Sequence, residues 1–237
     1  MKKNGLTLVE VLVVMAVLSI TGIFILNIFS QSLKGSNKTQ ILGVIKQNGQ
    51  AVLDTMDNTI RNADNVVCPY FISGDTAYSY TLVTVKDGIY TRYRLISADA
   101  NNTNTTTAAN ISCNNTVNPA RNSCFVQDNP IKQPISPGVE ETEPQLVARI
   151  CNEADPLLST AVLLTDNNPQ TGIAVNCVTG SCAPLPNSAN AIFVRDRSSG
   201  FKDQVTIRFI AKPGVSAPAA VAGQIDPVTF RTTINLR

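Results

Sequence analysis

The sequence predicts an α+β protein in which a long N-terminal helix packs on an antiparallel β-sheet of four or five strands. Two patterns lead to this prediction. Residues 6–67 contain no proline, and their apolar side chains recur first on every side of a helix and then on one side only. From residue 68 onward, short runs alternate between apolar and polar residues and are separated by turn residues, which is typical of antiparallel strands.

The first part of the predicted helix, residues 6–29, is a membrane-span candidate. It has one charged residue, Glu10, and about 20 apolar residues suffice to cross a bilayer core of roughly 30 Å. A secretory signal has a shorter apolar region followed by a cleavage site of small residues, and neither feature is present. A plain anchor leaves Glu10 unexplained, because a carboxylate inside a bilayer costs about 2.5–3.5 kcal/mol. The preceding Lys2 and Lys3 predict a single pass with the N-terminus in the cytoplasm.

Residues 30–67 are predicted to continue this helix outside the membrane, as an amphipathic segment. Apolar or small residues recur there at spacings of three and four, which places them on one helix face: Leu42, Ile45, Gly49, Val52, Met56, Ile60, Ala63 and Val67. Together the two segments predict one helix of about 60 residues, roughly 90 Å long.

Residues 68–237 are predicted to form one extracytoplasmic globular domain. Its strand candidates are residues 80–86, 89–96, 191–194, 204–211 and 228–236. Asp87-Gly88 separates the first two and is a strong signal for a tight hairpin. The residues between the second and third strands, 97–190, are rich in Asn, Thr and Pro and predict a long irregular insertion.

The cysteines indicate an oxidising compartment. Their number is even, all follow the apolar segment, and five of the six lie in the insertion: Cys68, Cys113, Cys124, Cys151, Cys177 and Cys182. The alternatives are reduced cysteines in a cytoplasmic domain or a zinc site, but the zinc site lacks any C-x-x-C pair. Six cysteines allow 15 pairings. A preference for short loops favours Cys177–Cys182 and Cys113–Cys124, which leaves Cys68 to pair with Cys151.

Composition argues against several functional classes. The chain has no histidine, so nucleophiles activated by histidine and zinc sites built on histidine are excluded. We therefore expect that the protein is not an enzyme and binds no cofactor. The net charge of +2 comes from Lys2 and Lys3, since the remaining 17 basic residues (19 − 2) balance 17 acidic ones, and no direct nucleic-acid binding is expected. Five acidic residues in the insertion lack the spacing of a calcium loop and predict a solvated acidic stretch without metal: Glu140, Glu141, Glu143, Glu153 and Asp155.

The N-terminus resembles the class III leader of type IV prepilins and of type II secretion pseudopilins. The resemblance lies in the leader KKNG (residues 2–5), the following LTLVE (residues 6–10) and the unbroken apolar run. It implies that residues 1–5 are a leader peptide, that a membrane peptidase cuts between Gly5 and Leu6, and that Leu6 is then N-methylated. It also implies that Glu10 pairs with the N-terminal amine of a neighbouring subunit. Asn27 stands where many members carry a proline.

Two further stretches resemble the J-type pseudopilins and related minor pilins: residues 51–66 and the ending FRTTINLR. The resemblance implies the type IV pilin fold and a minor pilin or pseudopilin that acts in initiation or at the tip of a type IV pilus or secretion pseudopilus. The implied partners are other pilin subunits, the prepilin peptidase and the inner-membrane assembly platform. The implied location is the cytoplasmic membrane and then a cell-surface filament. The alternative function is a filament-tip binding module, in which residues 97–190 recognise a surface, DNA or a secreted substrate.

Overall fold

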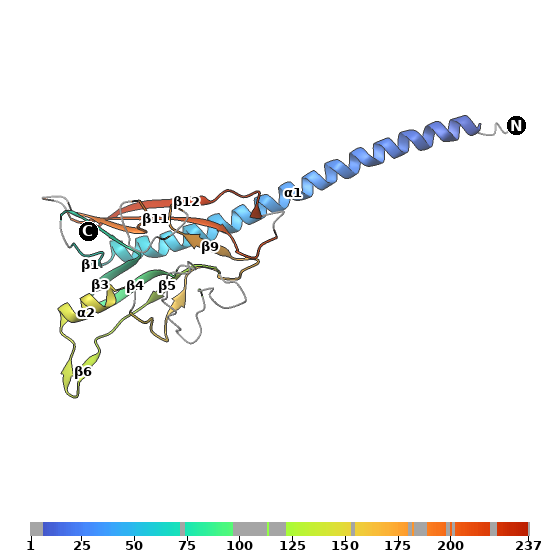
Figure 1. Cartoon of the computed structure of the whole chain (residues 1–237). Helices are drawn as coiled ribbons and strands as arrows, with labels where there is room; N and C mark the ends of the chain where they lie inside the picture. The colour runs from blue at the N-terminus through green and yellow to red at the C-terminus, as the bar shows by residue number, and fades with distance from the viewer. Residues whose placement is uncertain are drawn as a thin grey trace. The chain divides into compact units, whose positions relative to one another are not determined.

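The structure is a computed structural model (Figure 1). It describes residues 7–71, 74–96, 113, 122–152, 155–179, 182, 189–197, 200, 202–218 and 222–236. The chain divides into two compact units, Met1–Leu42 and Gly43–Arg237, and each is described by itself. The longest element, helix α1 (Leu8–Arg61), begins in the first unit and ends in the second.

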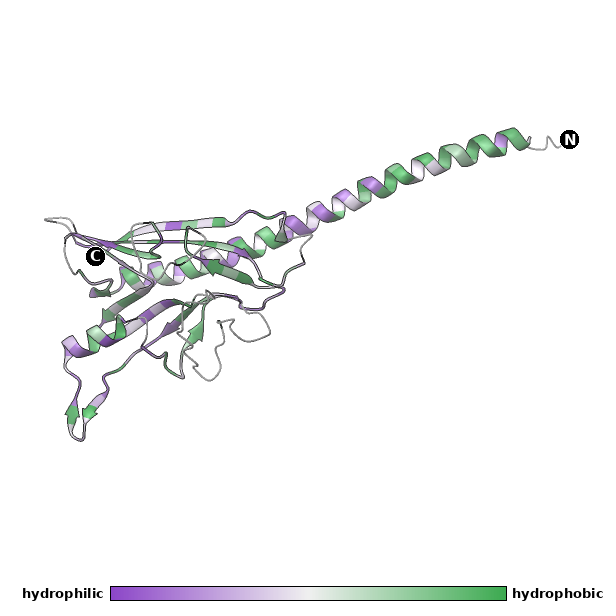
Figure 2. Cartoon of the chain, viewed as in Figure 1, coloured by the Kyte–Doolittle hydropathy of each residue, from purple (hydrophilic) through white to green (hydrophobic). Residues whose placement is uncertain are grey.

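In the first unit, α1 is an uninterrupted helix with exposed apolar side chains, green in Figure 2. Thr7 caps its start, since its side-chain oxygen accepts a hydrogen bond from the backbone N–H of Glu10 at 3.3 Å. The hydroxyl groups of Ser19 and Thr21 each donate to the carbonyl four residues earlier, at 2.8 Å. The helix is long and apolar enough to span a membrane, as the sequence predicts.

In the second unit, α1 buries one face, formed by Ile45, Gly49, Val52, Leu53, Met56 and Ile60. The predicted extension of the helix to residue 67 is wrong, because α1 ends at Arg61 and Asn65–Cys68 forms strand β1. Near the end, the side-chain amide of Asn62 donates to the backbone carbonyl of Asn58 at 2.8 Å. Pro69 disfavours helical geometry at the residue before it, and as a strand the segment buries Val66 completely.

The first sheet has five antiparallel strands in the order β1-β3-β4-β5-β8. The strands are β3 (Thr81–Lys86), β4 (Ile89–Ile96), β5 (Cys124–Asp128) and β8 (Val162–Leu163), beside β1. The predicted hairpin is confirmed: β3 pairs with β4, and Asp87 and Gly88 adopt φ values of 49° and 77° in the turn.

The second sheet runs in the order β12-β11-β10-β2, and β9 also pairs with β11. Its strands are β2 (Thr76–Ser79), β9 (Ile173–Asn176), β10 (Phe193–Asp196), β11 (Gln204–Pro213) and β12 (Val228–Asn235). The chain crosses from the second sheet to the first within one residue, Tyr80, which separates β2 from β3. A small hairpin, β6 (Pro134–Ser136) with β7 (Val139–Glu140), precedes helix α2 (Glu143–Ile150).

The globular part of α1 contacts both sheets (Figure 1). The ring of Phe230 from β12 occupies the space beside Gly49, where any Cβ would overlap it. On the other sheet, the hydroxyl groups of Thr59 and of Tyr93 from β4 form a hydrogen bond at 2.7 Å. Burial raises the pKa of the Tyr93 hydroxyl above its ordinary value.

Aromatic side chains join the two sheets directly. The ring of Phe125 from β5 meets that of Phe209 from β11 edge-on, with the centroids 5.0 Å apart. Phe209 in turn stacks on Phe230 at 5.0 Å. The core is therefore continuous from the first sheet through the second to α1.

The predicted α+β fold class is confirmed: a long N-terminal helix packs on antiparallel sheets, and the domain contains disulfides. Two expectations need correction. The described residues form two five-stranded sheets and a small hairpin, rather than one sheet. The insertion 97–190 is not irregular throughout, because it contributes β5 to β9 and α2, and β5 lies between β4 and β8.

Candidate functional site

All six cysteines form disulfides: Cys68–Cys151, Cys113–Cys124 and Cys177–Cys182. The two local pairs are those that the short-loop preference favours, and Cys68–Cys151 is the pair that they leave. The first links the end of β1 to the end of α2, across 83 residues of sequence. It therefore ties the insertion to the strand that follows α1, and it constrains the unfolded chain over a long loop.

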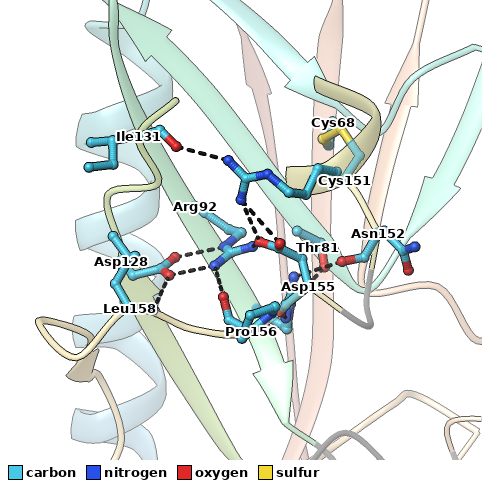
Figure 3. A network of polar contacts seen from close by, with 12 residues as sticks. Cys68, Thr81, Arg92, Asp128, Ile131, Cys151, Asn152, Asp155, Pro156 and Leu158 are labelled. Carbon is cyan, nitrogen blue, oxygen red and sulfur yellow. Dashed lines mark hydrogen bonds and ion pairs between the residues drawn. A yellow bond between two sulfur atoms is a disulfide. The ribbon is translucent and has the colours of Figure 1, made fainter. Parts of the chain in front are cut away.

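A buried ion-pair network lies between the first sheet and the segment around α2 (Figure 3). At its centre, the guanidinium of Arg92 on β4 donates two hydrogen bonds to the carboxylate of Asp128 on β5, at 2.7 and 2.5 Å. It also donates to the carboxylate of Asp155 and, at 3.0 Å, to the carbonyl of Pro156. Burial alone lowers the pKa of Arg92, but the two carboxylates outweigh this effect and hold it above its ordinary value.

Arg149, from α2, extends the network to the base of the β6–β7 hairpin. Its guanidinium pairs with both oxygens of Glu141, at 3.0 and 2.9 Å, and with Asp155 at 3.1 Å. It also donates to the carbonyl of Ile131 at 2.8 Å. Hydrogen bonding to Arg149 is the main cause that lowers the pKa of Glu141, and the same contact raises that of Arg149.

A third arginine, Arg94, lies two residues after Arg92 on the same face of β4. It donates to backbone carbonyls of the segment after α2, Asp155 at 2.6 Å and Asn152 at 2.9 Å. The network therefore balances three arginines against three carboxylates. Because each of the three carboxylates is paired with an arginine, the arrangement fits a structural clamp that holds α2 and the β6–β7 hairpin on the sheet.

The network corrects one expectation. The prediction of a solvated acidic stretch is wrong for Glu141 and Asp155, which are buried and paired with arginines. Within the described ranges, no cluster of three or more potential metal ligands is found. Two arginines at alternate positions of a strand were a signal for a buried charge cluster. The acidic partners of Arg92, however, lie 36 and 63 residues away along the chain, so the sequence did not identify them.

The network predicts acid sensitivity. The lowered pKa of Glu141 means that its contribution to stability is complete above its ordinary value of 4.5 and is lost as the pH falls through the folded-state pKa. We expect the free energy of unfolding, measured with urea, to fall between pH 5 and pH 3, approximate limits set by the ordinary carboxyl pKa. Glu141→Gln should be less stable at pH 7 and show a weaker pH dependence over this range. An unchanged pH dependence in the variant would contradict the role of Glu141.

Glu10 lies in the first turn of α1, where its side chain is exposed. Its carboxylate has no hydrogen bond or ion pair with any residue that the structure describes. The hydroxyl groups of Ser19 and Thr21, farther along the apolar segment, are satisfied within the helix. Glu10 is thus an exposed carboxylate in the apolar part of α1, where a charge inside a bilayer would be costly. Gly5 and Leu6 lie outside the described residues.

Residues 1–26 match the family described as the prokaryotic N-terminal methylation motif. The chain carries a pilin-type methylation motif. This motif is typical of type IV pilins and pseudopilins, and the α+β architecture matches the type IV pilin fold. Comparisons with curated proteins and with solved structures find no match.

The methylation motif supports a type IV pilin-like or pseudopilin-like surface subunit, and it points to a structural subunit rather than an enzyme. It implies association with other pilins and with the prepilin peptidase. Together with the apolar start of α1, it indicates membrane anchoring and a cell-surface filament. The resemblance to the J-type group, the cleavage site and the role of Glu10 stay predictions.

Proposed function

We propose that the chain is a minor pilin or minor pseudopilin that acts in initiation or at the tip of a type IV pilus or a type II secretion pseudopilus. The observation that carries this proposal is Glu10, an acid without a partner among the described residues, placed in the first turn of an apolar helix within the methylation motif. A filament in which such helices pack together supplies the missing cation. The N-terminal amine of a neighbouring subunit has the required charge and lies at the same end of its own helix.

The proposed sequence of events begins with a single-pass precursor whose N-terminus is in the cytoplasm. The prepilin peptidase cuts between Gly5 and Leu6, and the new amine of Leu6 is methylated. The assembly platform then moves the subunit into the filament, where Glu10 pairs with a neighbouring amine. A buried carboxylate is tolerable only with such a partner, so a subunit out of register keeps an unpaired charge.

Three features support a minor role. A major subunit repeats along the filament wall, so its outer face must fit neighbours at every position. The β6–β7 hairpin has exposed side chains along both strands. A tip position accommodates such a hairpin because no neighbouring subunit covers one side of a tip subunit. Residues 51–66 and the last strand resemble J-type subunits, which belong to a tip complex. The retained Glu10 distinguishes the chain from the cap subunit, which typically lacks this acid.

The second candidate function is recognition of a target at the filament tip through the segment 97–190. It has one observation in its favour, the β6–β7 hairpin. Ile135 is 53 % exposed and Val139 is 55 % exposed, and residues 134–139 carry no charge. A surface of this kind fits an apolar protein partner rather than a phosphate backbone.

We predict a mature chain of 232 residues (237 − 5) that begins with methylated Leu6. Intact-mass analysis of protein extracted from membranes measures this directly. Gly5→Leu should block processing, whereas Asn4→Ala is a matched control that should be cut normally. A product that begins beyond Phe29, as ordinary signal peptidase would give, would overturn the proposed function.

We also predict a low copy number. Quantitative mass spectrometry of purified filaments should find this chain at least about tenfold below the most abundant pilin, because tip subunits do not repeat along the wall. It should copurify with two or three other minor subunits that contact the exposed stripe of α1. A copy number equal to that of the most abundant pilin would show that it is a major subunit.

A further inference from the structure

The middle of α1 carries only positive charge. Lys34, Lys38 and Lys46 are the only charged residues between Glu10 and Asp54. Their side chains are exposed, and within the described part of the chain none of them has an ion pair or a side-chain hydrogen bond. This stretch of the helix therefore attracts an anionic partner that the described chain does not provide.

Two of these lysines lie directly beyond the apolar run that ends at Phe29. At 1.5 Å per residue, Lys34 is about 7.5 Å and Lys38 about 13.5 Å farther along the helix. The polar headgroup layer on each side of a bilayer core is about 5–8 Å thick. If Phe29 marks the edge of the hydrocarbon core, Lys34 lies at the outer limit of the headgroups and Lys38 just outside it.

The direction of helical side chains brings both lysines closer to the bilayer. The Cα–Cβ bonds of a helix tilt toward its N-terminus, so the two side chains lean back toward the apolar segment. Their spacing of four residues places them on one face, one above the other. Long, flexible stems then allow both ammonium groups to reach the phosphate layer.

We propose that Lys34 and Lys38 bind the phosphate groups of anionic phospholipids at the extracytoplasmic membrane surface before the chain enters a filament. This rests on the proposed function, because it requires the membrane-inserted state with the N-terminus in the cytoplasm. Glu10 lies 24 residues before Lys34, about 36 Å along the helix, and therefore near the opposite membrane surface. The lysines set the depth of the helix, and the contact must break when the subunit leaves the membrane.

The test uses the full chain in nanodiscs that contain equal amounts of phosphatidylglycerol and phosphatidylcholine. Native mass spectrometry counts the lipids of each kind that stay bound after release. The wild type should retain more phosphatidylglycerol than phosphatidylcholine. One lysine near an anionic surface contributes about a fivefold preference for anionic lipid. The preference of the double variant Lys34→Gln/Lys38→Gln for phosphatidylglycerol should therefore be about 25-fold lower than that of the wild type.

Lys46→Gln is the matched control, since Lys46 lies more than two turns beyond Lys38 and should leave the preference unchanged. The proposal is overturned if the wild type has no preference, if the double variant keeps it, or if Lys46→Gln lowers it equally. If the double variant keeps its lipid preference but is recovered less in filaments, the lysines instead bind an acidic neighbouring subunit. Processing and filament recovery of the wild type, measured separately, test the proposed function independently of the lipid result.

Discussion

Glu10→Val is expected to insert into the membrane normally but to be recovered in sheared filaments at least tenfold less than the wild type. Insertion becomes easier because a charge is removed from an apolar segment. Assembly becomes harder because the neighbouring amine loses its partner, and truncating one member of a buried charge pair costs about 2–5 kcal/mol. Quantitative immunoblots of the membrane and sheared fractions measure the two effects separately.

Ser19→Ala is the matched control for this experiment. It also removes a polar group from the exposed apolar part of α1, but the hydroxyl of Ser19 bonds to a carbonyl of its own helix and needs no neighbour. The control should enter filaments as the wild type does. Equal recovery of Glu10→Val and wild type would show that Glu10 does not set the register.

The parts of the fold that sequence reasoning found are those controlled by local patterns. The apolar segment and the one-sided continuation give α1, and Asp87-Gly88 gives the β3–β4 hairpin, because each depends on residues close together in sequence. The motif around Glu10 was found for the same reason, since its leader, acid and apolar run are contiguous.

The parts that sequence reasoning missed depend on distant partners. Strand β5 has only five residues, and it is a strand because β4 and β8 pair with its two edges. Strand β1 follows a helical pattern of apolar residues, but pairing with β3 and burial of Val66 override that pattern. The ion-pair network needs Arg92 to meet acids from two other segments, and the periodicity of a sequence does not encode such a meeting.

Arg92→Met is expected to destabilise the globular domain by about 3–5 kcal/mol, the cost of removing one member of a buried charge cluster. The side chains of Arg92 and Asp128 are fully buried, and that of Asp155 nearly so. Without the guanidinium, both carboxylates lose a buried cation, although Arg149 still pairs with Asp155. The clamp on the segment after α2 should loosen as well, because Arg92 also holds the carbonyl of Pro156.

Urea unfolding of the full chain in detergent, with the disulfides intact, measures this loss. Arg61→Ala is the matched control, because Arg61 forms an exposed ion pair with Asp57 on α1 and its removal should change stability little. Arg92→Met/Asp128→Leu should recover part of the lost stability, since it removes a stranded charge together with its partner. If Arg92→Met is no less stable than Arg61→Ala, the network does not clamp the insertion to the sheet, and the Cys68–Cys151 disulfide alone would have to hold α2 in place.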